Sequence, residues 1–397
     1  MNYIPPVMKI IHVVSGMDPR AGGISQAVRT MIRGLDGLGV VSEVVSTGLP
    51  SSTANDSFNT HFTGPGKTSW QFSLALSNWL RQNITRYDAV LVHGLWQHHT
   101  YAVYHALARI PGVRPRLFVM PHGMLDPWFQ KAKGRKIKAI RNWLIWHVFE
   151  QRVIHMADGL LFTCETEKQL ARTTFRPYRP KSERVVGLGV DAPPTYDREM
   201  NRAFAKRSTA ANRRYLLFLG RIDVKKGVDL LLTAYLDLKT RRDDLPALVI
   251  AGPGMDTPFG VHLRKLARAD PDVTFPGMLS GNAKWGAFYG CEAFVLPSHQ
   301  ENFGIAVVEA LACGKPVLIS DQVNIWQQIE DHGGGLIAKD TAEGIREMLL
   351  EWLSLAGANK ALLSFQARTI YREHYAVPQA AEKLYRALVQ PEIPVLT

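Results

Sequence analysis

The sequence has few cysteines and no long apolar run. Its 397 residues include three cysteines, Cys164, Cys291 and Cys313, whose wide spacing fits neither a metal site nor a disulfide framework. We therefore expect reduced core thiols and a cytoplasmic location. No stretch approaches the roughly 20 apolar residues that span a bilayer, and the first 14 residues lack the basic region and cleavage site of a signal peptide. These absences predict a protein that can lie on the inner face of the cell membrane without crossing it.

Internal repeats at solenoid periods and low-complexity tracts are also absent. The hydrophobic content of 46% and the aromatic content of 9% are ordinary globular values. A chain of 397 residues is long for a single core, so two domains are expected. Lysine and arginine outnumber aspartate and glutamate, which gives a net charge of +12. This charge favours anionic partners: a nucleoside diphosphate, an anionic lipid surface or nucleic acid. A soluble enzyme with a basic surface accounts for the charge equally well.

Short apolar runs recur along the chain, each followed by a turn and a helical pattern. A first set of expected strands lies at residues 9–14, 40–46, 89–93, 116–120, 159–163 and 185–190. A second set lies at residues 215–219, 247–251, 273–276, 293–296, 316–320 and 335–338. Continuous apolar strands that alternate with helices are typical of parallel sheets covered on both faces. The two sets predict two doubly wound, Rossmann-like α/β domains, joined by a polar and basic linker at residues 191–212.

The most informative segment is Ser298–Pro316, because open parallel sheets bind ligands at the carboxyl ends of their strands. After an apolar strand, a polar loop carries Glu301, Gly304 opens a helix, and Glu309 lies about one turn into it. The free N–H groups and the dipole of a helix N-terminus suit a diphosphate, and the two carboxylates could accept hydrogen bonds from ribose and sugar hydroxyls. Taken alone, the segment also fits two surface glutamates beside an ordinary helix.

Two further loops follow expected strands and are rich in glycine. In Gly220–Gly227 (GRIDVKKG), Arg221 and Lys226 are placed to converge on a phosphate, which arginine can bind through two hydrogen bonds and lysine as a point charge. Gly22 and Gly23 allow a close backbone approach to a ligand after the first strand. A basic surface loop and a common Gly-Gly turn are the alternatives. Neither loop is a Gly-x-Gly-x-x-Gly dinucleotide fingerprint or a Walker A loop.

Histidines cluster after two other expected strands. His122, in the segment PHGMLDPW, could hydrogen-bond a sugar hydroxyl as a neutral imidazole, or could have a purely structural role. His93, His98 and His99 lie together in HGLWQHH, and imidazole is a good metal ligand. No carboxylate or cysteine completes a metal-binding spacing there, so we expect no metal site.

Residues 130–153 form a basic amphipathic pattern. Lys133, Lys136 and Arg141 are interspersed with apolar residues, and Trp143 and Trp146 follow. The apolar positions are Ile137, Ile140, Leu144 and Val148. A helix with this pattern can lie on an anionic membrane surface with tryptophan at the interface. Packing of the apolar stripe against the sheet of its own domain is the favoured alternative.

Taken together, these segments resemble the GT-B glycosyltransferases, specifically the large retaining group known as glycosyltransferase family 4 (glycosyl transferases group 1). The most specific element is the Glu-x7-Glu arrangement of Glu301 and Glu309, followed by the loop Gly220–Gly227. The Gly-Gly turn, the Pro-His-Gly segment, AGPG (251–254) and FPG (275–277) occur in the matching order. The resemblance covers nearly the whole chain.

The resemblance implies the GT-B fold, in which two Rossmann-like doubly wound domains face one another across a cleft. Residues 1–195 would form the acceptor-binding domain and residues 196–375 the nucleotide-sugar-binding domain. The C-terminal helix, about residues 376–397, would pack back on the first domain. The implied activity is that of a metal-independent hexosyltransferase that uses a UDP- or GDP-linked sugar as donor and needs no other cofactor. The acceptor would be a glycan or lipid-linked oligosaccharide in exopolysaccharide or cell-surface polysaccharide biosynthesis.

The resemblance also implies a role for each matched residue. Arg221 and Lys226 would bind the donor diphosphate, with Gly22 and Gly23 over it from the first domain. Glu309 would accept hydrogen bonds from the ribose and Glu301 from the transferred sugar, while His122 would line the sugar and acceptor site. The backbone that touches the sugar and phosphates would be that of Asn302, Phe303, Gly304 and Ile305.

These groups suit glycosyl transfer, because the leaving nucleoside diphosphate gains negative charge that fixed cations and a helix N-terminus stabilise. We interpret the sequence as lacking an Asp-x-Asp motif, which favours metal independence. The main alternative is another sugar-nucleotide enzyme of this fold, such as an epimerase or a sugar-phosphate synthase. A nucleic-acid-binding protein fits the charge, but the sequence has no helix-turn-helix, RNP-like or zinc-finger signature, so we expect no nucleic-acid partner. A catalytically inactive scaffold is disfavoured by the presence of all four charged site residues.

Overall fold

The computed structural model describes residues 7–18, 23–50, 56–132 and 134–390, which form two compact units. Unit 1 comprises the chain up to Gly189 together with the segment from Val377, and unit 2 comprises Val190–Ala376. The sequence analysis placed the corresponding boundaries after residue 195 and before residue 376.

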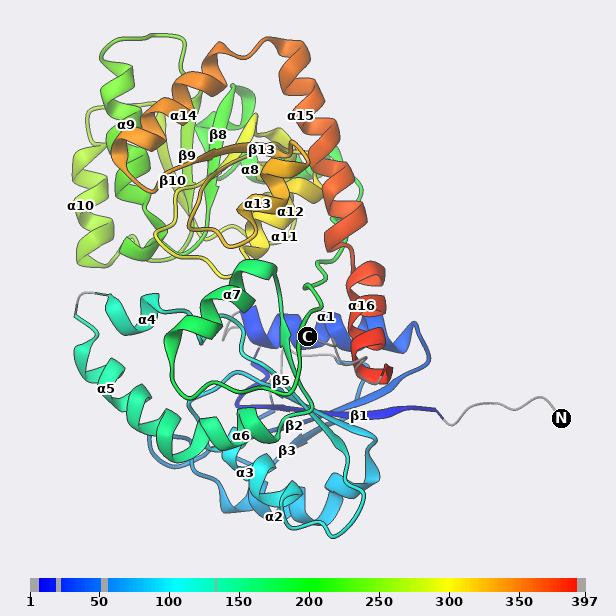
Figure 1. The fold of residues 1–397 in the computed structure, drawn as a ribbon. Helices are drawn as coiled ribbons and strands as arrows, with labels where there is room; N and C mark the ends of the chain where they lie inside the picture. The colour runs from blue at the N-terminus through cyan, green and yellow to red at the C-terminus, as the bar shows by residue number, and fades with distance from the viewer. Residues whose placement is uncertain (1–6, 19–22, 51–55, 133, 391–397) are drawn as a thin grey trace, which may run out of the picture. The chain divides into compact units, whose positions relative to one another are not determined.

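Unit 1 is built on a parallel sheet whose described strands have the order β3-β2-β1-β4-β5-β6-β7. Their bounds are β1 Lys9–Val14, β2 Val41–Ser46, β3 Thr60–Phe62, β4 Ala89–His93, β5 Arg116–Met120, β6 Gly159–Phe162 and β7 Glu183–Val185. The helices are α1 Gly23–Asp36, α2 Leu74–Asn83, α3 His98–Leu107, α4 Trp128–Lys131, α5 Lys136–Ile145, α6 Gln151–Met156, α7 Glu165–Thr174 and α16 Val377–Val389. Figure 1 shows the helices on both faces of this sheet, which is the doubly wound arrangement expected from the sequence.

Two edge strands of unit 1 differ from the prediction. Strand β3 was not predicted, because it has only three residues and none of them is fully buried. The last strand ends at Val185 instead of spanning 185–190. Val190 instead pairs with Ala376 in an isolated bridge of unit 2.

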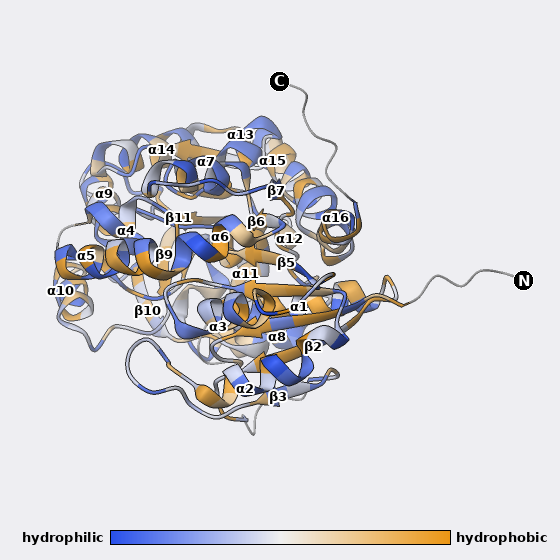
Figure 2. Ribbon diagram, turned by 60° about the horizontal axis from the view of Figure 1, so that its bottom comes forward, coloured by the Kyte–Doolittle hydropathy of each residue, from blue (hydrophilic) through white to orange (hydrophobic). Residues whose placement is uncertain are grey.

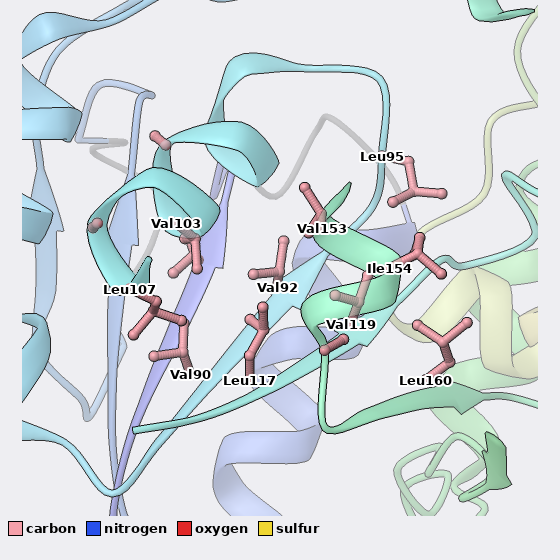
Figure 3. Close-up of a cluster of buried hydrophobic side chains, with 14 of the residues drawn as sticks. Val90, Val92, Leu95, Val103, Leu107, Leu117, Val119, Val153, Ile154 and Leu160 are labelled. Atoms are coloured by element: carbon pink, nitrogen blue, oxygen red, sulfur yellow. The ribbon is translucent and has the colours of Figure 1, made fainter. Parts of the chain in front are cut away.

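The core of unit 1 forms where the central strands meet the helices of one face. Figure 3 shows Val90 and Val92 of β4 and Leu117 and Val119 of β5 beneath apolar side chains of α3 and α6. The helix residues are Val103, Leu107, Val153 and Ile154. Alternate residues of the same strands point to the opposite face, and His93 is one of these.

Unit 2 contains a second parallel sheet, of order β10-β9-β8-β11-β12-β13 in its described residues. Its strands are β8 Tyr215–Leu219, β9 Ala247–Ala251, β10 Val273–Gly277, β11 Ala293–Leu296, β12 Val317–Ser320 and β13 Gly335–Ala338. Its helices are α8 Arg198–Ala205, α9 Val228–Lys239, α10 Pro258–Leu266, α11 Gly281–Gly290, α12 Ile305–Ala312, α13 Trp326–Asp331, α14 Ala342–Ser354 and α15 Gly357–Ile370. In the first sheet, Figure 2 shows mostly hydrophobic residues along β1, whose last five residues are buried, as parallel strands covered on both faces require.

The predicted linker at residues 191–212 is wrong. Asp197 caps the N-terminus of α8 by accepting a hydrogen bond from Glu199 N, and Met200 and Phe204 are buried one turn apart. The helix packs against α11 so closely that a Cβ on Gly286 would lie 2.1 Å from the carbonyl oxygen of Met200. The segment is therefore an integral part of unit 2.

The helix α16 belongs to unit 1, although the chain reaches it from unit 2 (Figure 1). It packs against α1, where a Cβ added to Gly34 would lie 2.7 Å from Cβ of Ala381. Arg184 of β7 donates a hydrogen bond of 2.8 Å to the carbonyl oxygen of Ala387. These contacts join the end of the chain to the sheet that its beginning forms.

The three cysteines are buried and free, as predicted. Burial raises the pKa of each thiol to about 12, so the thiols stay protonated and inert near neutral pH. Among the helices of the described ranges, none combines the length and the apolar character needed to cross a membrane.

Candidate active site

The loop that carries Arg221 and Lys226 is fixed at the carboxyl end of β8. Ile222 N donates to the carbonyl oxygen of Pro253 at 2.8 Å, and the Asp223 carboxylate accepts from Lys225 N at 3.0 Å. Gly227 ends the loop with φ of 63°, and a Cβ there would lie 2.0 Å from the carbonyl oxygen of Pro297. Only glycine fits this combination of left-handed backbone and close approach, and it brings the β8 loop against the loop after β11.

Lys226 connects these two loops directly. Its Nζ forms an ion pair with the carboxylate of Glu301, and the two side chains are only 16% and 18% exposed. Glu301 is held through its backbone as well, because its N donates to Gln322 O and its carbonyl oxygen accepts from Asn324 N, both at 2.9 Å. The sequence separates the two residues by 75 positions, and the structure brings them together at neighbouring strand ends.

Arg221 lies in the same loop and is exposed. Within the described residues, its guanidinium has no hydrogen bond or ion pair to the protein. Its donors are therefore available to an anion bound beside the loop.

The segment after Glu301 forms the start of α12. Gly304 is the N-cap with φ of 76°, and no side chain caps this helix. Phe303 is buried and meets Tyr375 edge-on, at 5.6 Å between ring centroids. Asn302 and Ile305, on either side, are partly exposed. The uncapped N–H groups at this end of α12 form a site suited to an anion.

Glu309 lies one turn into α12 and pairs with a residue that the sequence did not single out. Lys284 of α11 contacts Glu309 Oε1 at 2.6 Å, and its Nζ lies 4.5 Å from the centre of the Trp285 ring. Burial raises the pKa of Glu309, and the charge and hydrogen bond of Lys284 oppose this shift. Lys284 therefore helps to keep a largely buried carboxylate ionised.

The remaining predicted site residues belong to unit 1. Gly23 is exposed at the start of α1, and Gly22 lies outside the described residues. His122 follows β5 with a left-handed φ of 52°. Gly123 N donates to the buried Glu167 carboxylate at 2.5 Å, and the same carboxylate accepts from Thr163 N at 2.7 Å. This carboxylate, which the sequence analysis missed, fixes the loop that presents His122.

His98 and His99, which follow β4, form hydrogen bonds within unit 1. His98 Nδ1 accepts a long hydrogen bond from Ser73 N at 3.3 Å, and His99 Nε2 lies 3.0 Å from the carbonyl oxygen of His93. Within the described ranges, no three His, Cys, Asp or Glu side chains are grouped to hold a metal ion. His93 instead contacts His122, with 3.0 Å between Nδ1 and Nε2.

The interpretation that the sequence lacks an Asp-x-Asp motif is wrong, because one occurs at Asp270–Asp272. It precedes β10 and so lies at the amino end of that strand, at the edge of the sheet opposite to the loops above. Asp272 forms ion pairs with Lys239 and Arg213, each at 2.5 Å. Both partners hold the pKa of Asp272 below its usual value, Lys239 most strongly. This motif is therefore occupied by structural ion pairs.

The amphipathic segment, residues 130–153, is not the single helix that its pattern predicts. Instead of one helix over 130–153, the chain forms α4, α5, a π-helical stretch Trp146–Glu150 and α6. The buried positions of the described part of this segment are Asn142, Trp146, Glu150 and Val153. Glu150 accepts hydrogen bonds from Trp96 N at 2.7 Å and from Thr100 Oγ1 at 3.0 Å.

The apolar side chains of this segment point outward. Ile137, Ile140, Trp143, Leu144 and Val148 are 85%, 63%, 53%, 52% and 47% exposed. Packing of this stripe against the sheet, the favoured interpretation, is therefore wrong. Trp146 cannot serve as an interfacial residue either, because it is fully buried and stacks on Phe175 at 4.9 Å. Lys136 and Arg141 are exposed beside the stripe, and Lys133 lies outside the described residues.

Both units match known family descriptions. Residues 22–189 match the "Glycosyl transferase 4-like domain", and residues 199–365 match "Glycosyl transferases group 1". Among curated proteins, the D-inositol 3-phosphate glycosyltransferase of Kribbella flavida is 31% identical over 207 residues, which are 47% of this chain and 46% of that protein. The protein of the same name from Salinispora arenicola is 29% identical over 206 residues, or 47% of this chain and 45% of that protein. The chain thus spans about half the length of the curated relatives it matches.

Solved structures match over nearly the whole chain. A sucrose-phosphate synthase from Thermosynechococcus elongatus has a TM-score of 0.73 at 18% identity, over 96% of this chain and 99% of that chain. A glycosyltransferase from Rickettsia africae has a TM-score of 0.76 at 14% identity, over 98% and 100% of the two chains. HepE of Anabaena, solved in complex with UDP-glucose, has a TM-score of 0.72 at 15% identity, over 96% and 99%. At these identities the likeness establishes the fold, and the predicted GT-B fold class is confirmed.

Proposed function

Because the chain belongs to the GT-B glycosyltransferases of group 1, we propose that it transfers a sugar from a nucleoside-diphosphate sugar to a glycan or lipid-linked oligosaccharide with retention of configuration. The observation that carries the proposal is the Lys226–Glu301 contact. It unites a cationic loop, a carboxylate and an uncapped helix N-terminus at the carboxyl ends of β8 and β11. HepE, whose structure holds UDP-glucose, has the same fold and supports a nucleotide-linked donor.

The donor diphosphate would bind between the β8 loop and the start of α12. Arg221 has its donors available, and Lys226 already lies beside this helix terminus. As the bond to the sugar breaks, negative charge grows on the leaving diphosphate, and these groups stabilise it without reorganising. In this proposal the cations serve where other transferases use a divalent metal ion.

The two carboxylates would orient the sugar and the ribose. Glu309, kept ionised by Lys284, would accept hydrogen bonds from the ribose hydroxyls. Glu301 would accept from the transferred sugar, and its contact with Lys226 would align that sugar with the diphosphate. The leaving phosphate would take the proton of the acceptor hydroxyl on the same face of the sugar. This route retains the anomeric configuration without an enzyme nucleophile.

A product assay tests the proposal. The purified protein is incubated with UDP-, GDP- and ADP-linked hexoses and with candidate acceptors, and both nucleoside diphosphate and sugar products are measured. Transfer with retention, determined by NMR of the new linkage, supports the proposal. An epimerised sugar, or nucleoside diphosphate released without transfer to any acceptor, would instead favour the alternative sugar-nucleotide enzymes.

Two variants sharpen the assay. Lys226→Ala should lose transfer, whereas Lys225→Ala, one residue earlier in the same loop, should keep it. A thermal-shift screen with free nucleotides identifies the base, since a ligand at 100 times its Kd should stabilise the protein by about 2.7 kcal/mol.

We further propose that the protein works at an anionic membrane surface, in polysaccharide assembly. The outward apolar stripe of α5 and the π-helical stretch is accompanied by exposed Lys136, Lys138 and Arg141. Apolar side chains enter the acyl boundary while each nearby cation contributes roughly 1 kcal/mol with anionic lipid. This combination favours a lipid surface over a protein partner, because the charges flank the apolar residues along one helix.

Flotation with vesicles of anionic and of neutral phospholipid tests this second proposal. Binding should require anionic lipid and should weaken at high salt, because salt screens the charges. Replacing Lys136, Lys138 and Arg141 with Gln should abolish flotation. The matched control replaces the exposed Arg264 and Lys265 of α10 and the exposed Arg268 just after it, and should float normally. Equal flotation of both triple variants, or none by the unaltered protein, would contradict the proposal.

A further inference from the structure

Three histidines of unit 1 form a continuous chain of hydrogen bonds. His12 lies in β1, His93 ends β4, and His122 follows β5, and these strands are neighbours in the sheet. His12 Nδ1 lies 2.9 Å from His93 Nε2, and His93 Nδ1 lies 3.0 Å from His122 Nε2. The rings stack in sequence, at 5.2 and 5.3 Å between centroids. His12 and His93 are fully buried, whereas His122 is partly exposed. This row of hydrogen-bonded histidines therefore leads from the core to a single nitrogen at its outer end, His122 Nδ1.

All three rings are neutral near pH 7. Burial lowers the pKa of His12 to about 3 and that of His122 to about 4, and it lowers the pKa of His93 well below the usual value. A neutral imidazole has one donor nitrogen and one acceptor nitrogen. Both hydrogen bonds can therefore form in only two ways, with every ring donating toward His122 or every ring donating toward His12.

The inner end of the chain decides between the two directions. His12 Nε2 is buried and, within the described residues, has no hydrogen-bond partner. If the rings donate toward His12, this nitrogen carries an orphaned N–H group. If they donate toward His122, it carries only an unused lone pair. Buried N–H groups without a partner are rarer in proteins than acceptors without one.

His99, another buried imidazole of this region, shows the same preference. Its Nε2 lies 3.0 Å from a carbonyl oxygen, that of His93, so this nitrogen must be the donor. The other nitrogen of His99, Nδ1, is then an unprotonated acceptor, and it too is buried without a partner in the described chain. The interior of unit 1 thus already accommodates one bare imidazole nitrogen.

We propose that His12 and His93 are positioning residues that hold His122 in the tautomer protonated at Nδ1. His122 then presents a hydrogen-bond donor, and not a base, to an oxygen of a bound sugar. The backbone supports the same pose, since Gly123 N is held by Glu167 at 2.5 Å. The identity of the ligand rests on the proposed function, whereas the tautomer is a property of unit 1 alone.

The tautomer can be measured without any substrate. Protein labelled with ¹⁵N-histidine is studied by long-range ¹H–¹⁵N correlation, and the His122 signals are assigned by their loss in His122→Gln. We expect a protonated Nδ1 and an unprotonated Nε2 in the unaltered protein. In His93→Leu this pattern should become a mixture of both tautomers, while His93→Gln, whose amide can donate to His122 Nε2, should retain it. The opposite tautomer in the unaltered protein, or an unchanged pattern in His93→Leu, would overturn the proposal.

Kinetics then test the role of the donor. His93→Leu should lower kcat/KM for the sugar donor at least about tenfold, which is the scale of one lost hydrogen bond, and His93→Gln should recover most of it. The matched control is His98→Leu, which removes a buried imidazole that takes no part in the hydrogen bonds among His12, His93 and His122. This variant should leave kcat/KM within about twofold, below the loss expected for one hydrogen bond. If the unaltered protein shows the expected tautomer and His93→Leu shows the expected mixture, but kcat/KM of His93→Leu is unchanged, the positioning role is refuted. If the unaltered protein transfers no sugar at all, the proposed function fails while the spectra still decide the tautomer.

Discussion

Replacing Lys284 with Met should make donor binding at the proposed ribose site pH-dependent. Burial already raises the pKa of Glu309, and the Lys284 ammonium, 2.6 Å from its carboxylate, opposes the shift. Methionine keeps the length and the apolar stem of the side chain but removes the charge. The pKa of Glu309 should therefore rise further, so that more of this group is a protonated carboxyl at a given pH.

The expected loss follows from the hydrogen bonds that the carboxylate would make. Hydrogen bonds to charged groups contribute about 1.5–3 kcal/mol, so a protonated Glu309 should weaken donor binding by roughly 10- to 100-fold. The deficit should shrink as the pH rises, because Glu309 ionises again, whereas the unaltered protein should change little over the same range. The stability of the folded protein should change with pH in the opposite direction to donor binding. A carboxyl whose folded pKa is raised favours the folded state at low pH, so Lys284→Met should gain stability relative to the unaltered protein as the pH falls.

Donor KM and Kd measured across pH for the single variants and for the double variant with Glu309→Gln form a double-mutant cycle. In the Glu309→Gln background, Lys284→Met should have little further effect on donor binding, because there is no carboxylate left to protect. Additive losses in the double variant, or a pH-independent Kd in Lys284→Met, would refute the reasoning. The loss of the contact between Lys284 and the Trp285 ring, about 0.5–1 kcal/mol, should lower stability equally in both backgrounds.

Three further predictions concern the proposed donor-phosphate site, independence from metal ions and the π-helical stretch. Arg221→Ala should lower turnover by about 100-fold or more, since one fixed donor in the transition state contributes about 2–4 kcal/mol; circular dichroism should show an unchanged fold, and near-normal turnover would remove Arg221 from the site. Activity should survive EDTA, and complete loss that manganese or magnesium restores would show that a metal takes part. Trp146→Ala should lower the free energy of unfolding in urea by about 3–5 kcal/mol, whereas Trp143→Ala should change it by less than about 0.5 kcal/mol; similar values for the two would contradict their assigned burial.

The fold was readable from the sequence where strands are buried on both faces. Strands β1, β4 and β5 have the predicted bounds, because short runs rich in apolar residues between turns are typical of strands buried on both faces of a parallel sheet. The edge strand β3 has no such run, so no signal marked it. The helix α8 was mistaken for a linker because its composition is polar and basic. Met200 and Phe204, four positions apart, were the signal that could have identified it.

The candidate site was readable only where its residues lie in continuous motifs. The loops of Arg221 and Glu301 were found because glycine and charge recur at strand ends. Lys284 was missed, because a single lysine in a helix does not reveal that a carboxylate from another helix lies beside it. The contact between His12 and His93 likewise joins different strands, at 81 positions apart.

The outward direction of the apolar stripe on α5 could not be read from periodicity. A helical pattern identifies two faces but does not say which one is turned inward. Here Trp146 and the hydrogen-bonded Glu150 fix the inner face, so the hydrophobic residues are left outside. The tertiary contacts of a few residues thus override the average character of the segment.

The return of α16 to unit 1 has a consequence for synthesis on the ribosome. The segment that separates Gly189 from Val377 comprises 187 residues, Val190 to Ala376. At about 5–20 residues per second, roughly 10–40 s pass between completion of the seven-stranded sheet and arrival of the helix that covers α1. During that interval the nascent chain displays the side of α1 around Gly34 that Ala381 later covers. Unit 1 therefore cannot complete its packing until the whole of unit 2 has been synthesised.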